Sequence, residues 1–492
     1  MDHSCRGRKD DPRASHELTL TRLDGIRLPV VFAILFYLLY FLIRILENEL
    51  KFRIRLSSCN PLNHLMKTSF TLITLFVLSV AGCKSNATPN KSSVSTQPIR
   101  VSSAGGSAAE PAIAATSEGK VFVVWVDHGQ DRKADVMLGR FTSDGQMQDS
   151  PVRVNPQPGG ATAWRGDPPV VSVAPDQSIV VSWTARVEPD SGHATDLYVS
   201  VSRDEGRTFT NPVKVNDDMK PAVHGMHSLT VGRDGRIYVA WLDERNVAPI
   251  SAHDSKMREA SSGHHMESNR EVFIASSVDG GRTFSANQRV ATNVCPCCKT
   301  ALAVSDDGRV YISWRQVLPG NFRHIAVASS SDQGKTFSEP KIVSDDQWML
   351  AGCPVSGPAM AVTNDGSLHV LWYSAGKNGE TGLYSSESKD GAKSFGPRTF
   401  VAKGEIRGTP VLINDGKELA ATWENAGGTI MTVSLQSPAN ADKSPVKIAS
   451  GGLPAAVQTS KNFITAFSAE VNQQQAVWIT VAGRNDVKAT AR

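Results

Sequence analysis

The chain has 492 residues, a formal net charge of +4, and 20% charged and 40% hydrophobic residues. So mild a charge, with basic residues scattered along the chain, excludes a protein built around nucleic-acid binding, and the composition excludes a largely disordered chain. Gly and Pro are abundant, at 39 and 26 residues. Together with the scarcity of long stretches of helical periodicity, they indicate an all-β protein with many turns.

Two apolar segments lie near the N-terminus. The first, at residues 28–43, is slightly short for a membrane span of roughly 20 residues. The second follows Met66 with a basic start and a short apolar stretch, and it ends in Val80-Ala81-Gly82-Cys83. That is the layout of a secretory signal. Its ending resembles the lipobox of bacterial lipoproteins, in which the cysteine is acylated and becomes the new N-terminus, so the resemblance implies lipidation of Cys83.

The residue after Cys83 is Lys84 and not Asp, which in such lipoproteins allows passage to the outer membrane. The resemblance therefore implies an exported protein held by a lipid anchor on the periplasmic or surface side of the outer membrane. A plain secretory or transmembrane segment is the alternative. With a complete signal at 66–83, residues 1–65 are either a spurious extension or a true membrane anchor. The polar residues 84–96 are expected to form a flexible tether.

One pattern recurs over residues 97–485. A short apolar strand, a Gly or Asp turn, a second strand, a variable loop, a third strand, a turn and a fourth strand follow one another in each copy. The second strands end near an aromatic residue, namely Trp125, Trp183, Trp241, Trp314, Trp372 and Trp423, with a weaker seventh copy at Phe467. The period of about 55 residues predicts a β-propeller of seven blades, with six blades as the alternative.

The two ends of the repeat array complement each other. Residues 98–101 look like a fourth strand with no repeat before it, whereas the last repeat, at 453–483, offers only three strands. The N-terminal strand is therefore expected to complete the last blade, which closes the ring and hides sheet edges. Residues 486–492 would then be a tail.

A sharper motif, Ser-x-Asp-x-Gly-x-Thr-Phe, lies between third and fourth strands. It begins at Ser202, Ser277 and Ser330, and a degraded copy begins at Ser388. Asp and Ser side chains bond nearby amides in such a turn, and Gly adopts a left-handed conformation. The motif resembles the Asp box of the sialidase (neuraminidase) superfamily, a structural feature and not a catalytic one. Familiar members of that family have six blades, so a count of seven is a departure.

The family resemblance also implies an active site around the central channel, where the segments leading into the innermost strands converge. Sialidases clamp a sugar carboxylate with arginines, attack with a Tyr assisted by a Glu, and use an Asp as acid/base. Here the clamp would be Arg165, Arg245, Arg315 and Arg407. Tyr373 would be the nucleophile with Glu424 as its partner, and Asp167 or Asp243 the acid/base.

The segment before the first inner strand, residues 108–111, lacks the arginine that the family has there. Two functions therefore stay open. One is hydrolysis or binding of sialic-acid-type or other acidic glycans, and the other is a non-catalytic module for a glycan, another small molecule or a metal.

Four cysteines lie in the lead segments of two consecutive repeats: Cys295, Cys297, Cys298 and Cys353. Neighbouring lead segments lie side by side, so the Cα atom of Cys353 is predicted within about 7 Å of one of the other three, the reach of a disulfide. Export would favour such bridges. The Cys-Pro-Cys-Cys segment also resembles that of a subgroup of sialidase-like propellers named exo-α-sialidase.

A metal site is the alternative interpretation of these cysteines. His224, Met226 and His227 of the preceding repeat are expected to face the same space, and thiolates with imidazole and thioether groups suit copper or zinc. One bridge and a two-thiol copper site would combine both interpretations. Redox chemistry is a third, so the sequence leaves the cofactor open.

Overall fold

The computed structural model describes residues 97–129, 133–162, 166–187, 193–247, 270–350, 352–416, 418–435 and 444–484. All of these fall in the second of two compact units, Asn90–Arg492. The predicted signal segment with Cys83, the tether at 84–96 and the tail at 486–492 lie outside the described residues, as does Arg165. Within the described part, no helix has the length and apolar character needed to cross a membrane.

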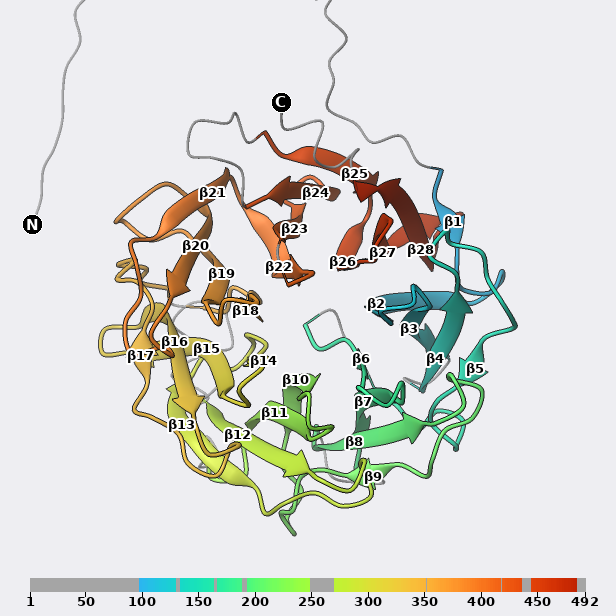
Figure 1. Ribbon diagram of the computed structural model, residues 1–492, viewed down its shortest axis with the longest axis horizontal. Helices are drawn as coiled ribbons and strands as arrows, with labels where there is room; N and C mark the ends of the chain where they lie inside the picture. The colour runs from blue at the N-terminus through green and yellow to red at the C-terminus, as the bar shows by residue number, and fades with distance from the viewer. Residues whose placement is uncertain are drawn as a thin grey trace, which may run out of the picture. The chain divides into compact units, whose positions relative to one another are not determined.

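The described chain folds into antiparallel four-stranded units, the blades of a propeller, and the third and fourth blades are joined into one eight-stranded sheet where Val294 pairs with Gln316 (Figure 1). Blade one contains β2 (Ser107–Ala115), β3 (Val121–His128), β4 (Ala134–Phe141) and β5 (Val152–Arg153). Blade two contains β6 (Val170–Val173), β7 (Ile179–Arg186), β8 (Thr195–Ser202) and β9 (Val213–Lys214). Blade three contains β10 (His224–Val231), β11 (Ile237–Asp243), β12 (Arg270–Ser277) and β13 (Gln288–Val294).

The second half of the chain continues the series. Blade four contains β14 (Ala301–Val304), β15 (Val310–Leu318), β16 (Phe322–Ser330) and β17 (Lys341–Ile342). Blade five contains β18 (Ala359–Val362), β19 (Leu368–Ser374), β20 (Gly382–Ser388) and β21 (Thr399–Lys403). Blade six contains β22 (Ile406–Asn414), β23 (Leu419–Asn425), β24 (Thr429–Ser434) and β25 (Val446–Ser450). Blade seven contains β26 (Gly452–Gln458), β27 (Asn462–Val471), β28 (Gln474–Gly483) and β1 (Ile99–Arg100).

The ring closes in the way the sequence predicts. The inner strands β2, β6, β10, β14, β18, β22 and β26 contact one another in chain order, and β26 returns to β2 (Figure 1). The N-terminal β1 pairs with β28, with Ile99 opposite Ile479, and the amide of Val101 donates to the carbonyl of Val477 at 2.8 Å. The described residues thus form seven blades and not six, and β1 covers the outer edge of β28.

Tryptophans of the second strands fill the spaces between blades. Trp125, Trp241, Trp314 and Trp372 are at most 1% exposed. Trp125 packs with Ile464 and Ile479 of blade seven, so each blade is held to its neighbour by large apolar contacts as well as by chain connectivity. This confirms that these tryptophans belong to the inter-blade core.

The four Asp boxes close turns between third and fourth strands in blades two to five. In the first box, Asp204 accepts hydrogen bonds from the hydroxyl groups of Ser202 at 2.7 Å and Thr208 at 2.6 Å, and from the Thr208 amide at 2.9 Å. Gly206 has φ +82°, and a Cβ there would lie 2.8 Å from Leu138 of blade one. The box therefore needs glycine both for its backbone conformation and for contact with the preceding blade.

Candidate functional site

The lead segments of the inner strands share an unusual backbone. Five of these segments each contain a residue with a positive φ, namely Glu110 (52°), Met226 (53°), Val355 (48°), Gly408 (74°) and Leu453 (54°). In β2, β10, β22 and β26 this residue sits at a register shift of the strand pair. Such bulges bend a strand and turn side chains out of its regular alternation, so the inner strands start with groups directed away from the sheet.

These segments converge on a small cavity of about 60 Å³, which we call the channel mouth. Blades one, two, four, five, six and seven all contribute to its lining, which consists of Pro111, Gly166, Pro168, Lys299, Val355, Arg407, Gly408, Thr409, Leu453 and Pro454. The sequence prediction that lead segments far apart in the chain meet at one place is confirmed. Lys299 and Arg407 are the charged side chains in this lining.

Lys299 lies beside a buried aspartate–histidine pair. Asp167 is 3% exposed and accepts hydrogen bonds from the Nδ1 atom of His227 at 2.9 Å and from its amide at 3.0 Å. Burial would raise the pKa of Asp167, but His227 and Lys299 outweigh it and hold that pKa below its ordinary value. Burial in turn lowers the pKa of Lys299 to about 8, against the opposing charge of Asp167. The lysine ammonium is therefore easier to deprotonate than an ordinary one.

The cysteines meet as predicted. Cys297 and Cys353 form a disulfide with Cα atoms 6.1 Å apart, inside the predicted limit. Cys295 and Cys298 are free and each 1% exposed, and their sulfur atoms lie 3.2 Å apart. The Cys298 hydrogen bond and the charges of Arg323 and Arg315 lower the pKa of Cys295 to about 7, whereas burial raises the pKa of Cys298.

The two histidines predicted beside the cysteines are held by aspartates instead. His227 bonds to Asp167, and the Nε2 atom of His224 lies 3.1 Å from Asp218 and 3.5 Å from Asp243. Among the described residues, one group of three His, Cys, Asp or Glu side chains has its possible ligand atoms within 4.8 Å of one another. It consists of Cys295, Cys297 and Cys353 and includes neither histidine. Met226 packs in the same apolar cluster as the cysteines. The bulge in β10 explains the separation, because it directs successive side chains toward different neighbours.

Asp243 and Arg245 belong to a buried network in blade three. Asp243 is 0% exposed and accepts the indole N–H of Trp241 at 2.7 Å, just as Asp127 accepts that of Trp125 at 2.7 Å. Arg245 bonds to Asp243 at 2.9 Å and to Asp217 at 2.6 Å. Both predicted site residues therefore stabilise the blade, and neither lines the channel mouth.

Arg315 and Tyr373 are also inside the protein. Arg315 is 0% exposed and donates to the carbonyl groups of Ser356 at 2.9 Å and Tyr373 at 2.9 Å. Tyr373 is 8% exposed, and its ring meets Trp348 edge-on at 5.4 Å. Burial, followed by the negative charge of Glu405, raises the pKa of Tyr373. The phenol is thus more difficult to ionise than a free tyrosine.

Arg407 reaches the channel mouth, and Glu424 lies beside it in the interior. Glu424 is 2% exposed and accepts the amide of Leu453 at 3.0 Å. Its other oxygen lies 3.8 Å from Arg407, whose side chain is 57% exposed. Of the three predicted clamp arginines within the described residues, Arg407 is the one that lines the mouth. The sequence interpretation missed Lys299, although its place directly after Cys298 in a lead segment was a usable signal.

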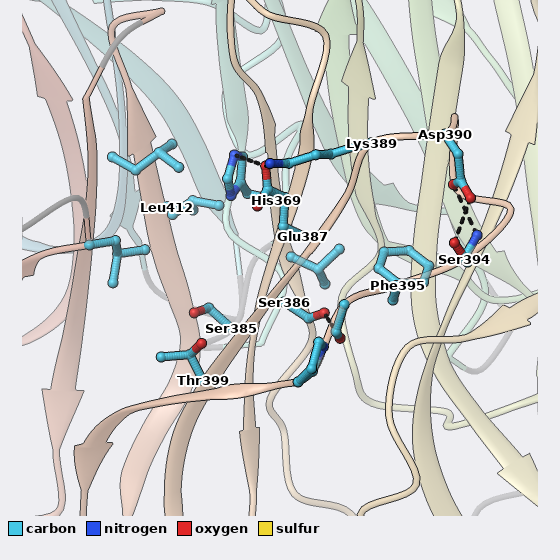
Figure 2. Close-up of a pocket in the computed structure, with 15 residues that line it drawn as sticks. His369, Ser385, Ser386, Glu387, Lys389, Asp390, Ser394, Phe395, Thr399 and Leu412 are labelled. Carbon is cyan, nitrogen blue, oxygen red and sulfur yellow. Dashed lines mark hydrogen bonds and ion pairs between the residues drawn. The ribbon is translucent and has the colours of Figure 1, made fainter. Parts of the chain in front are cut away.

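A larger cavity lies elsewhere, between blades five and six. It has a volume of about 550 Å³ and is lined by residues of β19, β20 and β22 and by the Asp box of blade five. Figure 2 shows His369, Glu387, Lys389 and Leu412 among the residues that line it. The wall includes Leu435, after which the described chain is interrupted, so the described residues do not define its outer boundary.

Seven blades around a polar channel mouth, four of them with an Asp box, define this protein as a β-propeller. Residues 119–406, more than half of the chain, match the model of the BNR repeat-like domain, and the chain belongs to that family. No curated protein matches the chain.

Several solved structures are similar to this chain at low sequence identity and with TM-scores below 0.5. A protein of unknown function from Dyadobacter fermentans is 13% identical, with a TM-score of 0.47, over 79% of this chain and 98% of that one. The Hadza microbial sialidase Hz136 is 15% identical, with a TM-score of 0.44, over 77% and 66% of the two chains. The NanB sialidase of Streptococcus pneumoniae is 10% identical, with a TM-score of 0.42, over 80% and 98%.

Proposed function

We propose that the channel mouth binds the anionic group of an acidic sugar. The observation that carries this proposal is the lining of the mouth, in which the charged side chains are two cations, Lys299 and Arg407. The nearby carboxylates Asp167 and Glu424 are buried and already accept hydrogen bonds. An anion would therefore meet positive charge first.

The size of the cavity limits what can enter it. About 60 Å³ is far below the roughly 300–1,000 Å³ typical of a pocket that encloses a whole ligand. A carboxylate fits such a space, and the sugar ring would then lie across the rim formed by Pro111, Pro168 and Pro454. A terminal sialic-acid-type or uronic sugar has this combination of a small anionic group and a larger neutral ring.

Binding is better supported than hydrolysis. The four candidate catalytic groups Tyr373, Glu424, Asp167 and Asp243 are each at most 8% exposed. A nucleophile must reach its substrate and a base within hydrogen-bond distance, whereas Tyr373 packs on Trp348 and Glu424 faces Leu453. Release of sialic acid from a sialoside would show that hydrolysis occurs after all, and loss of that release in Tyr373→Phe would assign it to Tyr373.

The binding proposal is tested by titration calorimetry with sialyllactose and a uronic-acid oligomer, with lactose as the neutral control. Lys299→Ala and Arg407→Ala should each weaken binding of the acidic sugars by at least about tenfold, because a hydrogen bond to a charged group contributes about 1.5–3 kcal/mol. The matched control is Lys389→Ala, since Lys389 is 74% exposed in the Asp box of blade five. Equal affinity for lactose, or no effect of either mouth variant, would contradict the proposal.

A further inference from the structure

We propose that Cys295, Cys298 and Met226 form a binding site for one cuprous ion, Cu(I), in the core between blades three and four. This site is separate from sugar binding at the channel mouth and needs no acidic glycan. The structure places three sulfur-bearing side chains, each 1% exposed, in one apolar cluster. Two of them are thiols with no covalent partner.

The spacing of the two thiols suits a shared metal ion. Their sulfur atoms are 3.2 Å apart. That separation is longer than a disulfide bond of about 2.05 Å. It is within the span of roughly 4.6 Å that two metal–sulfur bonds of about 2.3 Å can bridge. Cys297 and Cys353 are joined to each other, so the other two cysteines are the thiols left to bind an ion.

The chemistry of the donors selects a soft ion. Met226 adds a thioether, and its positive φ of 53° at the β10 bulge places it in the cluster with the cysteines. Thiolate and thioether ligands favour Cu(I), whereas hard cations prefer oxygen. Structural zinc is usually held by four protein ligands, and the closed bridge leaves only two thiolates here.

The charges around the site call for thiolate rather than a second disulfide. Arg315 is 0% exposed and Arg323 is 4% exposed. Arg315 donates to carbonyl oxygens, and the Nη1 atom of Arg323 has no hydrogen-bond partner. Among the described residues, no carboxylate forms an ion pair with either guanidinium. Buried charges are costly unless they are paired.

The sulfur atoms supply the missing negative charge. The amide of Cys295 donates to the Arg315 carbonyl at 2.9 Å, so the backbone of the thiol segment lies against the strand that carries Arg315. Two thiolates around one Cu(I) leave a net charge of about −1 beside the two guanidinium groups. A disulfide between Cys295 and Cys298 would be neutral and would add no negative charge near Arg323, whose Nη1 atom has no hydrogen-bond partner.

The test uses the full chain under anaerobic conditions, titrated with Cu(I) in competition with the chelator bicinchoninate. One equivalent should bind, with an ultraviolet band from thiolate-to-copper charge transfer. Loss of an outer-shell partner costs about 10–100-fold in metal affinity, so loss of a direct ligand in Cys298→Ser should cost at least about 100-fold. The variant Met226→Leu, which conserves volume, should lower the affinity by about 10-fold.

Two controls separate binding from folding. Met219→Leu, at a methionine that is 95% exposed, should leave the affinity unchanged. The double variant Cys297→Ser/Cys353→Ser should still bind one Cu(I) if its circular dichroism is that of the folded protein. The proposal is overturned if Cu(I) does not bind, or if Cys298→Ser binds it as well as the unchanged chain. Zn²⁺ binding as tight as that of Cu(I) would also overturn it, as would loss of Cu(I) binding in the folded double variant.

Discussion

Aspartate residues in this propeller act mainly as acceptors that fix turns and indole rings. Asp243 was predicted as a catalytic acid/base because it lies on the right loop, but it accepts the Trp241 indole in the way that Asp127 accepts that of Trp125. The repeated Trp-x-Asp spacing was visible in the sequence and would have indicated this structural role. The buried position of the Arg315 side chain, in contrast, depends on its hydrogen bonds to carbonyl groups of blade five. No local pattern in the sequence reveals these hydrogen bonds.

The Asp boxes give a prediction at this scale. Hydrogen bonds from Thr208 and Ser202 outweigh burial and lower the pKa of Asp204 to about 2. Since its folded pKa lies below the ordinary value, Asp204 stabilises the fold above about pH 4, and this contribution is lost as the pH falls toward about 2. We expect Asp204→Ala to lower the melting temperature at pH 7 by a few degrees, with a smaller difference from the unchanged chain at pH 3.

The matched control for that measurement is Asp306→Ala. Asp306 is 55% exposed in its side chain and pairs only with Arg233 among the described residues, and exposed ion pairs contribute little. Equal melting temperatures for Asp204→Ala and the unchanged chain at pH 7 would show that the box does not stabilise the turn.

At the scale of strands, the sequence predicts the architecture well because each blade repeats the same apolar pattern and turn. The N-terminal strand predicted at 98–101 also pairs with the last blade as expected, since the outer edge of β28 needs a hydrogen-bonding partner. What the repeat does not encode is the bulge near the start of four inner strands, β2, β10, β22 and β26. In β10 such a bulge lets Met226 pack in the apolar cluster that contains the cysteines while His227 bonds to Asp167. The predicted metal ligands Met226, His224 and His227 remain a prediction.

Ring closure can be tested at Val101, which follows β1 and is 2% exposed. Val101→Asp would bury a carboxylate against the apolar cluster of blades one and seven, and we expect it to destabilise the fold by about 3 kcal/mol or more. Denaturant unfolding measures the loss, and amide exchange in β28 should accelerate. Val278→Asp, at a valine that is 70% exposed, should be close to neutral. Equal effects of the two variants would mean that β1 does not seal the ring.

For the whole molecule, the propeller gathers side chains from distant repeats at one small opening. The sequence placed Arg407 there through the sialidase resemblance, but the position of Lys299 depends on the packing of the cysteine segment beside Asp167 and Pro168. A Cβ on Gly357 would lie 2.1 Å from the carbonyl oxygen of Lys299, so only glycine allows blade five to approach this segment so closely. The lipid anchor at Cys83 remains a prediction, because it lies outside the described residues.

The most direct test of anion binding at the channel mouth is the affinity for an acidic sugar at pH 7 and at pH 9, measured by titration calorimetry on the unchanged chain and on Lys299→Ala. Because burial lowers the pKa of Lys299 to about 8, the ammonium is mostly charged at pH 7 and mostly neutral at pH 9. The account predicts that affinity falls by about tenfold between the two pH values in the unchanged chain and stays nearly constant in Lys299→Ala. Equal affinities at both pH values in the unchanged chain, or the same fall in the variant, would contradict it.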